Sequence, residues 1–292
     1  MTITLTGRVA IVTGAGGGLG RSHALALARY GARVVVNDMS PQGAEAVAKE
    51  IVDAGGEAIA HVCSVTDRVG VDAMTAAVVG RWGAVDILVN NAGILRDKTF
   101  AKMDLDDFAA VVDVHLMGSV NVTKAAWPHM RERNYGRVIF TTSSSGLYGN
   151  FGQSNYGAAK MALVGLMQTL ALEGDRHGIR VNCLAPSAAT RMTQDLYLPE
   201  DLKGLSSDLV SPGVVALAAE DAPTRAILLA GAGAFEQANI TMTRGIYVGE
   251  ANDAAERIQA GWAQISDRTG EQAPVSGAAQ YHHEVNHPAR VG

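Results

Sequence analysis

A tyrosine and a lysine four residues apart, Tyr156 and Lys160, are the pair in this sequence best suited to acid–base chemistry. In a helix, residues i and i+4 share one face, so the phenol and the ammonium would be neighbours. A free tyrosine has a pKa of about 10, too high for a base at neutral pH, and an adjacent cation lowers it. Three serines, Ser143 to Ser145, lie just upstream. The pair could therefore move a proton onto or off an alcohol oxygen.

A glycine-rich stretch from Gly14 to Gly20 follows the first apolar run of the chain. Glycine lets the backbone turn tightly and approach a pyrophosphate, and the next helix offers free amides and the positive end of its dipole. Because the stretch lies between an expected strand and an expected helix, it predicts a dinucleotide site. Its expected contacts are Gly14, Gly18, Leu19 and Gly20.

A carboxylate, Asp38, ends the second expected strand, 18 residues after Gly20. An acidic residue at this place accepts hydrogen bonds from both hydroxyls of the adenosine ribose and repels a 2′-phosphate. Met39 and Ser40 follow it, so no arginine stands directly behind the carboxylate. The sequence predicts NAD rather than NADP as the cofactor. The alternative for Asp38 is a solvated loop charge.

Apolar runs alternate with helical patterns along the chain. Most of the runs are continuous in valine, isoleucine and leucine, as in strands buried on both faces of a parallel sheet. The expected strands are Val9–Thr13, Arg33–Asn37, Ile59–Cys63, Ile87–Asn90, Val138–Thr142 and Val181–Ala185. The expected helices are 41–54, capped by Ser40; 67–82, capped by Thr66; 105–133, broken near Pro128; and 154–177. This alternation predicts the α/β class, with a single Rossmann-type doubly wound parallel sheet and helices on both faces.

The composition excludes several classes of function. A net charge of −5 over 292 residues, with no basic stripe, argues against a nucleic-acid surface. No signal peptide and no apolar stretch long enough to span a membrane is visible, so we expect a cytoplasmic protein. The two cysteines, Cys63 and Cys183, fit neither metal nor redox spacing and are expected to be buried thiols.

The pattern changes beyond Tyr247. We expect residues 1–250 to form the NAD-binding domain with the substrate pocket, and residues 251–292 to form a C-terminal helix and a loose tail. The helix is expected within 250–267, with Ile258, Trp262 and Ile265 on one side. The tail is rich in Gly, Pro, Ser and His, which favours a flexible segment over a metal site at its histidines, His282, His283 and His287. No metal is expected.

With these motifs in place, residues 5–250 resemble the short-chain dehydrogenase/reductase family. The family's TGxxxGxG loop matches Thr13, Gly14, Gly18 and Gly20, its NNAG motif matches Asn90 to Gly93, its YxxxK motif matches Tyr156 and Lys160, and its catalytic serine matches Ser143. The resemblance implies that Asn91, Ala92 and Gly93 border the adenine site. It also implies that Pro186 and Ala189 lie in a loop over the nicotinamide, and that Lys160 holds the nicotinamide ribose.

A closer resemblance is to the dehydrogenase unit of peroxisomal multifunctional enzyme type 2. It is carried by the stretches 14–21, 91–98, 148–153 and 191–193. Those enzymes oxidise (3R)-hydroxyacyl-CoA to 3-ketoacyl-CoA and are also described as 17β-hydroxysteroid dehydrogenases. The family commonly assembles as dimers or tetramers through the long helices after the fourth and fifth strands, so a homodimer or homotetramer is expected.

Two positions depart from the wider family. His115 stands where a catalytic asparagine is usual, and the closer subfamily also tends to have histidine there. His115 could relay a proton through water, or it could be a packed histidine that holds a backbone group. Ser64, followed by Val65, stands where an aspartate usually contacts adenine, and is expected to make a weaker contact.

The expected reaction is hydride transfer from a secondary alcohol to NAD. Tyr156 as phenolate takes the hydroxyl proton, Lys160 lowers the tyrosine pKa, and Ser143, with Ser144 and Ser145 as alternatives, holds the substrate oxygen. Apolar residues of 191–250, Met192 among them, are expected to line a pocket for a bulky group. Arg96, Lys98 and Arg191 could meet a CoA phosphate.

The substrate and the function class have alternatives. The substrate could be a fatty acyl-CoA, a steroid-derived acyl-CoA or a free hydroxysteroid. A non-catalytic nucleotide-binding regulator and a serine hydrolase using Ser143 are the competing classes. The first is disfavoured by the intact Tyr156 and Lys160, and the second by the absence of a Gly-x-Ser-x-Gly elbow.

Overall fold

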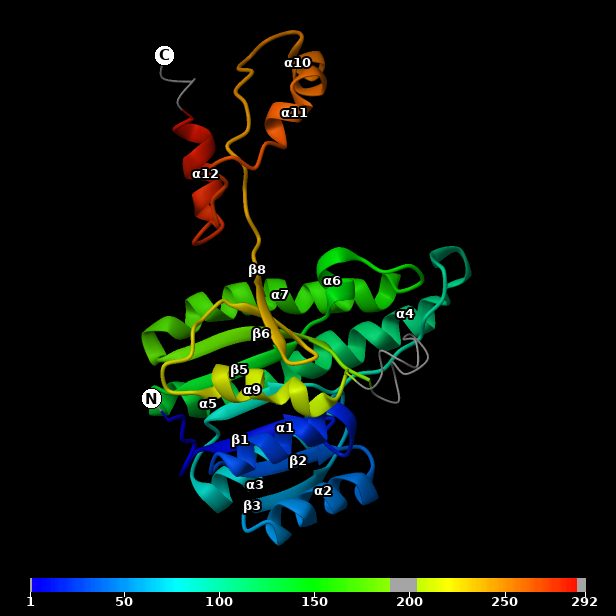
Figure 1. The fold of residues 1–292 in the computed structure, drawn as a ribbon, viewed down its shortest axis with the longest axis vertical. Helices are drawn as coiled ribbons and strands as arrows, with labels where there is room; N and C mark the ends of the chain where they lie inside the picture. The colour runs from blue at the N-terminus through cyan, green and yellow to red at the C-terminus, as the bar shows by residue number, and fades with distance from the viewer. Residues whose placement is uncertain (1, 190–203, 288–292) are drawn as a thin grey trace. The chain divides into compact units, whose positions relative to one another are not determined.

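The computed structural model describes residues 2–189 and 204–287, and the chain divides into two compact units, residues 1–237 and 238–292. The first unit holds one eight-stranded sheet in the order β3-β2-β1-β4-β5-β6-β7-β8 (Figure 1). Its strands are β1 (Val9–Thr13), β2 (Arg33–Asp38), β3 (Glu57–Val62), β4 (Ile87–Asn90), β5 (Gly136–Thr141), β6 (Ile179–Ser187), β7 (Ile227–Gly231) and β8 (Ala234–Ala238).

The sheet confirms the predicted Rossmann-type fold. The pairs from β3 to β7 are all parallel, and the six predicted strands lie within two residues of the observed bounds. Every residue of β1, β4 and β5 is buried, as their continuous apolar runs require. The strand order reverses between β1 and β4. In such sheets a ligand binds in the crevice at the carboxyl ends of these two strands.

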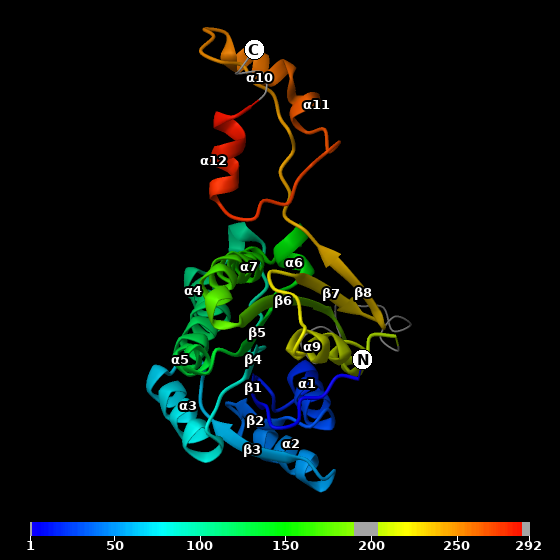
Figure 2. The ribbon, with the colours of Figure 1, turned by 90° about the vertical axis from the view of Figure 1, so that its left-hand side faces the viewer.

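Helices cover both faces of the sheet (Figure 2). On one face lie α1 (Gly18–Arg29), α2 (Pro41–Asp53) and α9 (Ser211–Ala218); on the other lie α3 (Arg68–Trp82), α4 (Leu105–Val112), α5 (Gly118–Arg133) and α7 (Ser154–Gly174). Ser40 caps α2 as predicted, because its side chain accepts from Gly43 N. The Thr66 cap was wrong. Asp67 caps α3 by accepting from Val69 N, whereas Thr66 Oγ1 lies 2.8 Å from Ser64 Oγ.

The helix predicted over 105–133 is interrupted, but not at Pro128. Pro128 lies inside α5, which continues past it to Arg133. The interruption is a π-helical turn, Asp113–Met117, between α4 and α5. Such a turn inserts one extra residue and is frequent at functional sites. His115 lies in the middle of this turn.

Helices α6 and α9 and strands β7 and β8 were not predicted. The short helix α6 (Ser144–Tyr148) follows β5, and β7 and β8 extend the sheet beyond β6. The turn between β7 and β8 contains Ala232 and Gly233, both at positive φ, as in the turns that suit two-residue hairpins. Strand β8 carries no residue buried in the core, which explains why its sequence has no continuous apolar run.

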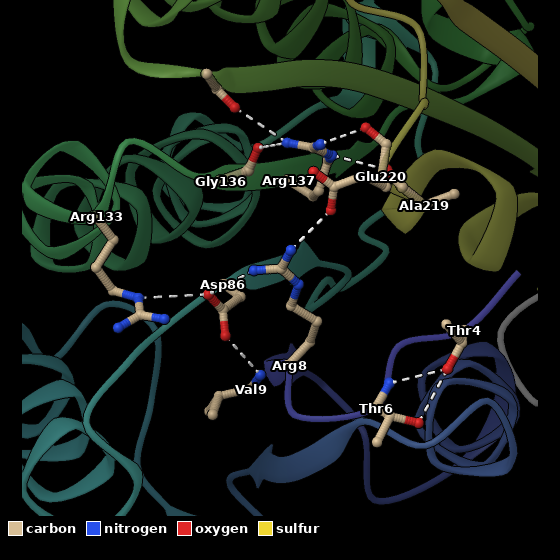
Figure 3. A network of polar contacts seen from close by, with 11 residues as sticks. Thr4, Thr6, Arg8, Val9, Asp86, Arg133, Gly136, Arg137, Ala219 and Glu220 are labelled. Carbon is tan, nitrogen blue, oxygen red and sulfur yellow. Dashed lines mark hydrogen bonds and ion pairs between the residues drawn. The ribbon is translucent and has the colours of Figure 1, made fainter.

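A buried carboxylate organises the amino-terminal edge of the sheet (Figure 3). Asp86, just before β4, is fully buried and accepts a hydrogen bond from Val9 N at 2.9 Å. One of its oxygens lies 3.7 Å from Arg8 and 3.6 Å from Arg133. Arg8 also donates to Glu220 at 2.7 Å.

Arg137 is buried near Asp86, and main-chain carbonyls accept the hydrogen bonds of its guanidinium. Its guanidinium donates to Ala219 O and Glu220 O at 2.8 and 2.7 Å, and also to the carbonyls of Gly136 and Gly178. The Arg8 and Arg137 guanidiniums lie 3.5 and 4.2 Å from the centroid of the Tyr135 ring. These contacts fix the starts of the strands and leave the opposite edge of the sheet for the candidate site.

The second unit is built from short helices, α10 (Ala254–Ala260), α11 (Trp262–Ile265) and α12 (Ala278–Val285). The helix expected within 250–267 is therefore two short helices, and the segment expected to be a loose tail contains α12. None of residues 238–287 is buried. No group of three or more potential metal ligands occurs among the described residues. The described helices include none that is long and apolar enough to cross a membrane.

Candidate active site

The loop between β1 and α1 is shaped by glycine. Gly14 and Gly18 have φ of +61° and +53°, the left-handed region that favours glycine. A Cβ on Gly20 would overlap the carbonyl of Gly14. No side chain caps the first residues of α1, so its leading amides are available to an anion. The predicted residues Gly18, Leu19 and Gly20 are the first residues of α1, and Gly14 lies in the loop before it, an arrangement that suits a pyrophosphate.

A threonine joins this loop to the segment after β4. Thr13 Oγ1 accepts from the main-chain amides of Asn91 and Ala92 at 3.0 and 3.1 Å. The Asn91 side chain donates back to Thr13 O and Gly14 O at 3.0 and 3.2 Å. The two loops are therefore held together at the carboxyl ends of β1 and β4, which places Asn91 and Ala92 beside the glycine loop, while their contact with a cofactor stays a prediction.

Asp38 faces the glycine loop from the end of β2. Its Oδ2 accepts from Gly16 N at 2.8 Å and its Oδ1 accepts from Ser40 N at 2.9 Å. A Cβ on Gly16 would lie 2.9 Å from this carboxylate, so glycine is needed for the approach. This contact with the glycine loop argues against the alternative of a solvated loop charge.

The loop after β3 holds the other two residues expected near adenine. Ser64 bonds within its own turn, to Thr66. Val65 is buried, and its carbonyl accepts from Asn121 at 3.0 Å. A Cβ on Gly118 would overlap the Val65 side chain, so α5 packs tightly under this loop.

The lysine of the acid–base pair is fully buried on α7. Lys160 Nζ donates to Thr141 O, at the end of β5, at 2.6 Å, and it lies 5.4 Å from the centroid of the Tyr156 ring. The Lys160 carbonyl accepts from Thr142 Oγ1 at 2.7 Å. Burial lowers the pKa of Lys160 to about 7, an effect that Cys183 opposes. The structure therefore brings Tyr156 and Lys160 together as the i, i+4 spacing predicts.

Ser143 lies between β5 and α6. It is buried and caps α6, because its Oγ accepts from Ser145 N at 3.2 Å. Ser144 and Ser145, the alternatives in the sequence, are the first residues of that helix. A Cβ on Gly146 would lie 2.8 Å from the Lys160 side chain, so α6 packs directly on the lysine.

His115 reaches the same place from the π turn. Its Nε2 lies 2.8 Å from Ile94 O and 3.0 Å from Ile94 N, and its ring meets the Tyr156 ring edge-on, with centroids 5.2 Å apart. Burial, and then the charge of Lys160, lowers the pKa of His115 to about 3. A Cβ on Gly93 would overlap the imidazole, so Gly93 makes room for His115.

Several supporting residues had no clear signal in the sequence. Asn155, fully buried, donates to Arg96 O at 2.9 Å and accepts from Tyr156 N at 2.7 Å. Gln153 donates to Asp97 at 2.6 Å. Together they fasten the segment after β4 to the start of α7. Asn155 directly precedes Tyr156, and Gln153 ends the stretch 148–153 that carries the closer resemblance.

The remaining predicted contacts are only partly described. Pro186 lies in β6 and Ala189 just after it, where Ala189 N donates to Leu205 O at 2.7 Å. Met192 and Arg191 lie outside the described residues. Arg96 and Lys98 both pair with Asp107, at 3.5 and 3.0 Å, and each keeps about half of its side chain exposed. The two cysteines are free; Cys183 is buried and Cys63 is half-buried.

Comparisons with known proteins agree with this geometry. A model of the short chain dehydrogenase family matches residues 8–201. A protein of Mycobacterium tuberculosis named as a short-chain type dehydrogenase/reductase is 46% identical over 273 residues, 90% of this chain and 95% of that protein. Peroxisomal multifunctional enzyme type 2 of Mus musculus is 41% identical over 281 residues, 92% of this chain and 38% of the mouse protein.

A solved structure shows the same fold. Full-length peroxisomal multifunctional enzyme type 2 from Drosophila melanogaster superposes with a TM-score of 0.83 and 36% identity, over 99% of this chain and 51% of that chain. This chain therefore spans about half or less of the length of these multifunctional relatives.

Proposed function

This chain belongs to the short-chain dehydrogenase family, and from that premise we propose that it oxidises a secondary alcohol to a ketone with NAD. The substrate we propose is a (3R)-hydroxyacyl-CoA, which becomes a 3-ketoacyl-CoA. The observation that carries the proposal is the set of Ser143, Tyr156 and the buried Lys160 at the end of β5, together with a glycine loop faced by Asp38.

Tyr156 is the proposed base. Lys160 is fully buried on the same helix, and as an ammonium it stabilises the phenolate of Tyr156, so the tyrosine takes a proton from the alcohol. A dinucleotide, when bound, accepts the hydride at its nicotinamide. Ser143 donates a hydrogen bond to the substrate oxygen, and its place at the start of α6 fixes the hydroxyl beside β5.

The Lys160 carbonyl and ammonium are both held by β5 and the residue after it. This anchoring fixes the position of the Lys160 amine relative to Tyr156. Burial lowers the pKa of the Lys160 amine from 10.5 to about 7. A phenolate beside Lys160 favours the charged form of the amine, so the protonation states of the two groups are coupled.

We assign His115 a positioning role in place of a proton relay. Its Nε2 contacts both the amide and the carbonyl of Ile94, which hold the ring in place. Its low pKa keeps the ring neutral throughout the physiological range. The edge-on contact with the Tyr156 ring holds the phenol in place, and Gly93 provides the space for this contact.

Asp38 supports NAD over NADP. Its carboxylate is held by two main-chain amides and faces the loop that would receive the adenosine half. A 2′-phosphate at that position would meet a fixed negative charge, whereas two ribose hydroxyls would find an acceptor.

The CoA part of the proposal is supported by two cations. Arg96 and Lys98 share one carboxylate, Asp107, and each keeps about half of its side chain exposed. Phosphate groups bind at such positions. A free 17β-hydroxysteroid remains the alternative substrate, because it needs no such cation and the proton chemistry is the same.

We further propose a homodimer or homotetramer in the cytoplasm. Helix α7 exposes Met161 and Leu172, 40% and 49% accessible, in the described chain. On α5, a surface cavity of about 390 Å³ is lined by Lys124, Trp127, Pro128, Arg131, Glu132 and His177 and contains none of the predicted site residues. Light scattering of the purified protein measures the assembly, and cell fractionation measures the location.

The decisive experiment measures NADH formation at 340 nm with (3R)-hydroxyacyl-CoAs of several chain lengths and with 17β-hydroxysteroids. Turnover of an acyl-CoA with NAD supports the proposal, and turnover of steroids alone replaces the substrate. Parallel assays with NADP test the cofactor. Dinucleotide binding without turnover of either substrate would contradict the substrate assignment and leave the family assignment in place.

A further inference from the structure

Helix α1 buries two adjacent polar residues, Ser22 and His23, among apolar neighbours. Ser22 is 3% and His23 is 0% exposed, while Ala24, Ala26 and Leu27 of the same helix belong to the apolar core. A polar side chain is buried at a cost unless it has a hydrogen-bond partner. Neither residue contacts the acid–base pair or the glycine loop in the hydrogen bonds of the described chain, so the proposed mechanism leaves both unexplained.

Both side chains find their partner in one short segment. Ser22 Oγ donates to Asp208 Oδ1 at 2.7 Å. His23 Nδ1 lies 2.9 Å from Ser211 Oγ, the first residue of α9. Asp208 itself lies in a 3₁₀ turn, Ser207–Leu209, capped by Ser206. Residues 205–211 are therefore attached to α1 by two adjacent side chains.

The direction of the histidine bond follows from its neighbour. Ser211 Oγ donates to Ser207 O at 3.3 Å, so it accepts from His23, whose Nδ1 then carries the hydrogen. Burial lowers the pKa of His23 to about 3, so the ring stays neutral and this bond does not respond to physiological pH. The contact is a fixed link, and a change of pH does not switch it.

The same segment is attached to the strand end at the proposed nicotinamide site. Leu205 O accepts from Ala189 N at 2.7 Å, and Ala189 follows the end of β6 at Ser187. A chain of contacts thus runs from α1 through residues 205–211 to Ala189. Helix α1 begins at Gly18, at the end of the glycine loop, only one turn before Ser22.

We propose that Ser22 and His23 are positioning residues that fix residues 205–211 to the dinucleotide helix and thereby hold Ala189 at the nicotinamide site. The proposal rests on dinucleotide binding at the start of α1. Apolar contacts such as those of Val210 and Val214 are non-directional, so by themselves they define the register of α9 on α1 less sharply than hydrogen bonds do. Two hydrogen bonds of fixed length permit only one register. A dinucleotide that reduces the mobility of α1 on binding would therefore also reduce the mobility of residues 205–211.

The test uses variants that separate the bond from the packing. His23→Leu removes the donor to Ser211, whereas His23→Asn places an amide near the former Nδ1 and restores it. Asp208→Leu removes the acceptor for Ser22, whereas Asp208→Asn keeps a carbonyl oxygen there. The Asn variants are the matched controls, because they change size or charge and conserve the hydrogen bond.

The first readout is hydrogen exchange of the amides of residues 204–211 with and without saturating dinucleotide. In the wild type we expect the dinucleotide to slow this exchange about tenfold. In the double variant Asp208→Leu/His23→Leu we expect the slowing to be lost. In the Asp208→Asn and His23→Asn variants we expect at least half of it to return.

The second readout is the split between kinetic constants. We expect the double Leu variant to raise the KM of the alcohol substrate about tenfold, the size of one lost hydrogen bond, and to change the KM of the dinucleotide less than threefold. Dinucleotide-dependent slowing that persists in the double Leu variant would overturn the proposal. So would Asn variants that behave like the Leu variants.

The experiment uses whichever of NAD and NADP binds the wild type. A wrong cofactor assignment shows itself in the wild type, by binding of the other dinucleotide. A wrong coupling shows itself only in the variants. If the wild-type segment is already fully protected without dinucleotide, the coupling proposal is wrong, whatever the cofactor.

Discussion

The hydrogen bonds that shape the glycine loop are partly buried, whereas those that hold Lys160 are buried. Gly16 N reaches Asp38, and Asn91 reaches Thr13 and Gly14, all within loops at the edge of the sheet. Lys160 is instead enclosed by β5, α6 and the neighbourhood of His115. The glycine loop is thus partly open to solvent, where a ligand could reach its amides, whereas burial of Lys160 lowers the pKa of its amine.

In the catalytic region, Tyr156→Phe should reduce activity the most. The change removes one oxygen and leaves the ring that contacts His115. We expect kcat to fall about 10²- to 10⁴-fold, the usual contribution of a proton-transfer group, with little change in dinucleotide affinity. Steady-state assays and dinucleotide titration measure the two quantities. Tyr30→Phe, at the end of α1, is the control and should leave kcat unchanged. Equal activity in both variants would rule out Tyr156 as the base.

In the nucleotide region, Asp38→Asn should weaken NAD binding and leave the acid–base pair intact. The change removes a negative charge that two main-chain amides hold in place. We expect the KM of NAD to rise about 10- to 100-fold and the preference for NAD over NADP to shrink by a similar factor, since hydrogen bonds to charged groups are the strong ones. Asp53→Asn, at the exposed end of α2, is the control. A preference unchanged by Asp38→Asn would show that another group selects the cofactor.

Gly93→Ala tests the junction of the two regions. A Cβ there would overlap the His115 ring, so the imidazole must move away from Tyr156. We expect a destabilisation of about 1–3 kcal/mol, as overpacking usually costs, and a fall in kcat that exceeds the change in the KM of NAD. Thermal unfolding and kinetics measure these effects. Gly80→Ala, where a Cβ meets nothing within 4 Å, should instead stabilise α3 by about 0.5–1 kcal/mol.

The lowered pKa of the buried Lys160 predicts how the stability of the protein depends on pH. Its pKa is about 7 in the folded protein, below the ordinary value of 10.5, so between these two values the unfolded chain holds a proton that the folded chain lacks. The free energy of unfolding should therefore rise with pH across this window, by up to about 1.4 kcal/mol per pH unit. Denaturant unfolding of the unliganded protein and of Lys160→Met measures the difference. A difference that is flat with pH would contradict the lowered pKa.

The glycine loop and the parallel sheet could be predicted because local sequence determines them. The apolar runs of β1 and β4 and the spacing from Gly20 to Asp38 are visible without any knowledge of distant residues. The role of His115 could not be predicted in this way, since it depends on the π turn and on the space above Gly93. The carbonyl of Thr141 that binds Lys160 has no side-chain signal at all.

The differences between the predicted and the observed elements have identifiable physical causes. Thr66 and Asp67 are adjacent potential caps, and the choice between them was made by the bond from Thr66 to Ser64. Pro128 is compatible with α5, whereas the real interruption lies at residues without proline or glycine. Strand β8 lacks an apolar run because none of its residues is buried in the core. The roles of Ser143, Tyr156 and Asp38 remain predictions for experiment.

The contact between Arg8 and Glu220 joins residues 212 positions apart, at the opposite edge of the sheet from the site. A ribosome has to release most of the chain before this ion pair can close. Until then Arg137 lacks the carbonyls of Ala219 and Glu220 that accept from it in the finished fold. Contacts of such long sequence separation slow folding and prolong exposure of unpaired strands. The early half of this protein should therefore depend on chaperones during synthesis, and translation pauses before residue 220 should increase its aggregation.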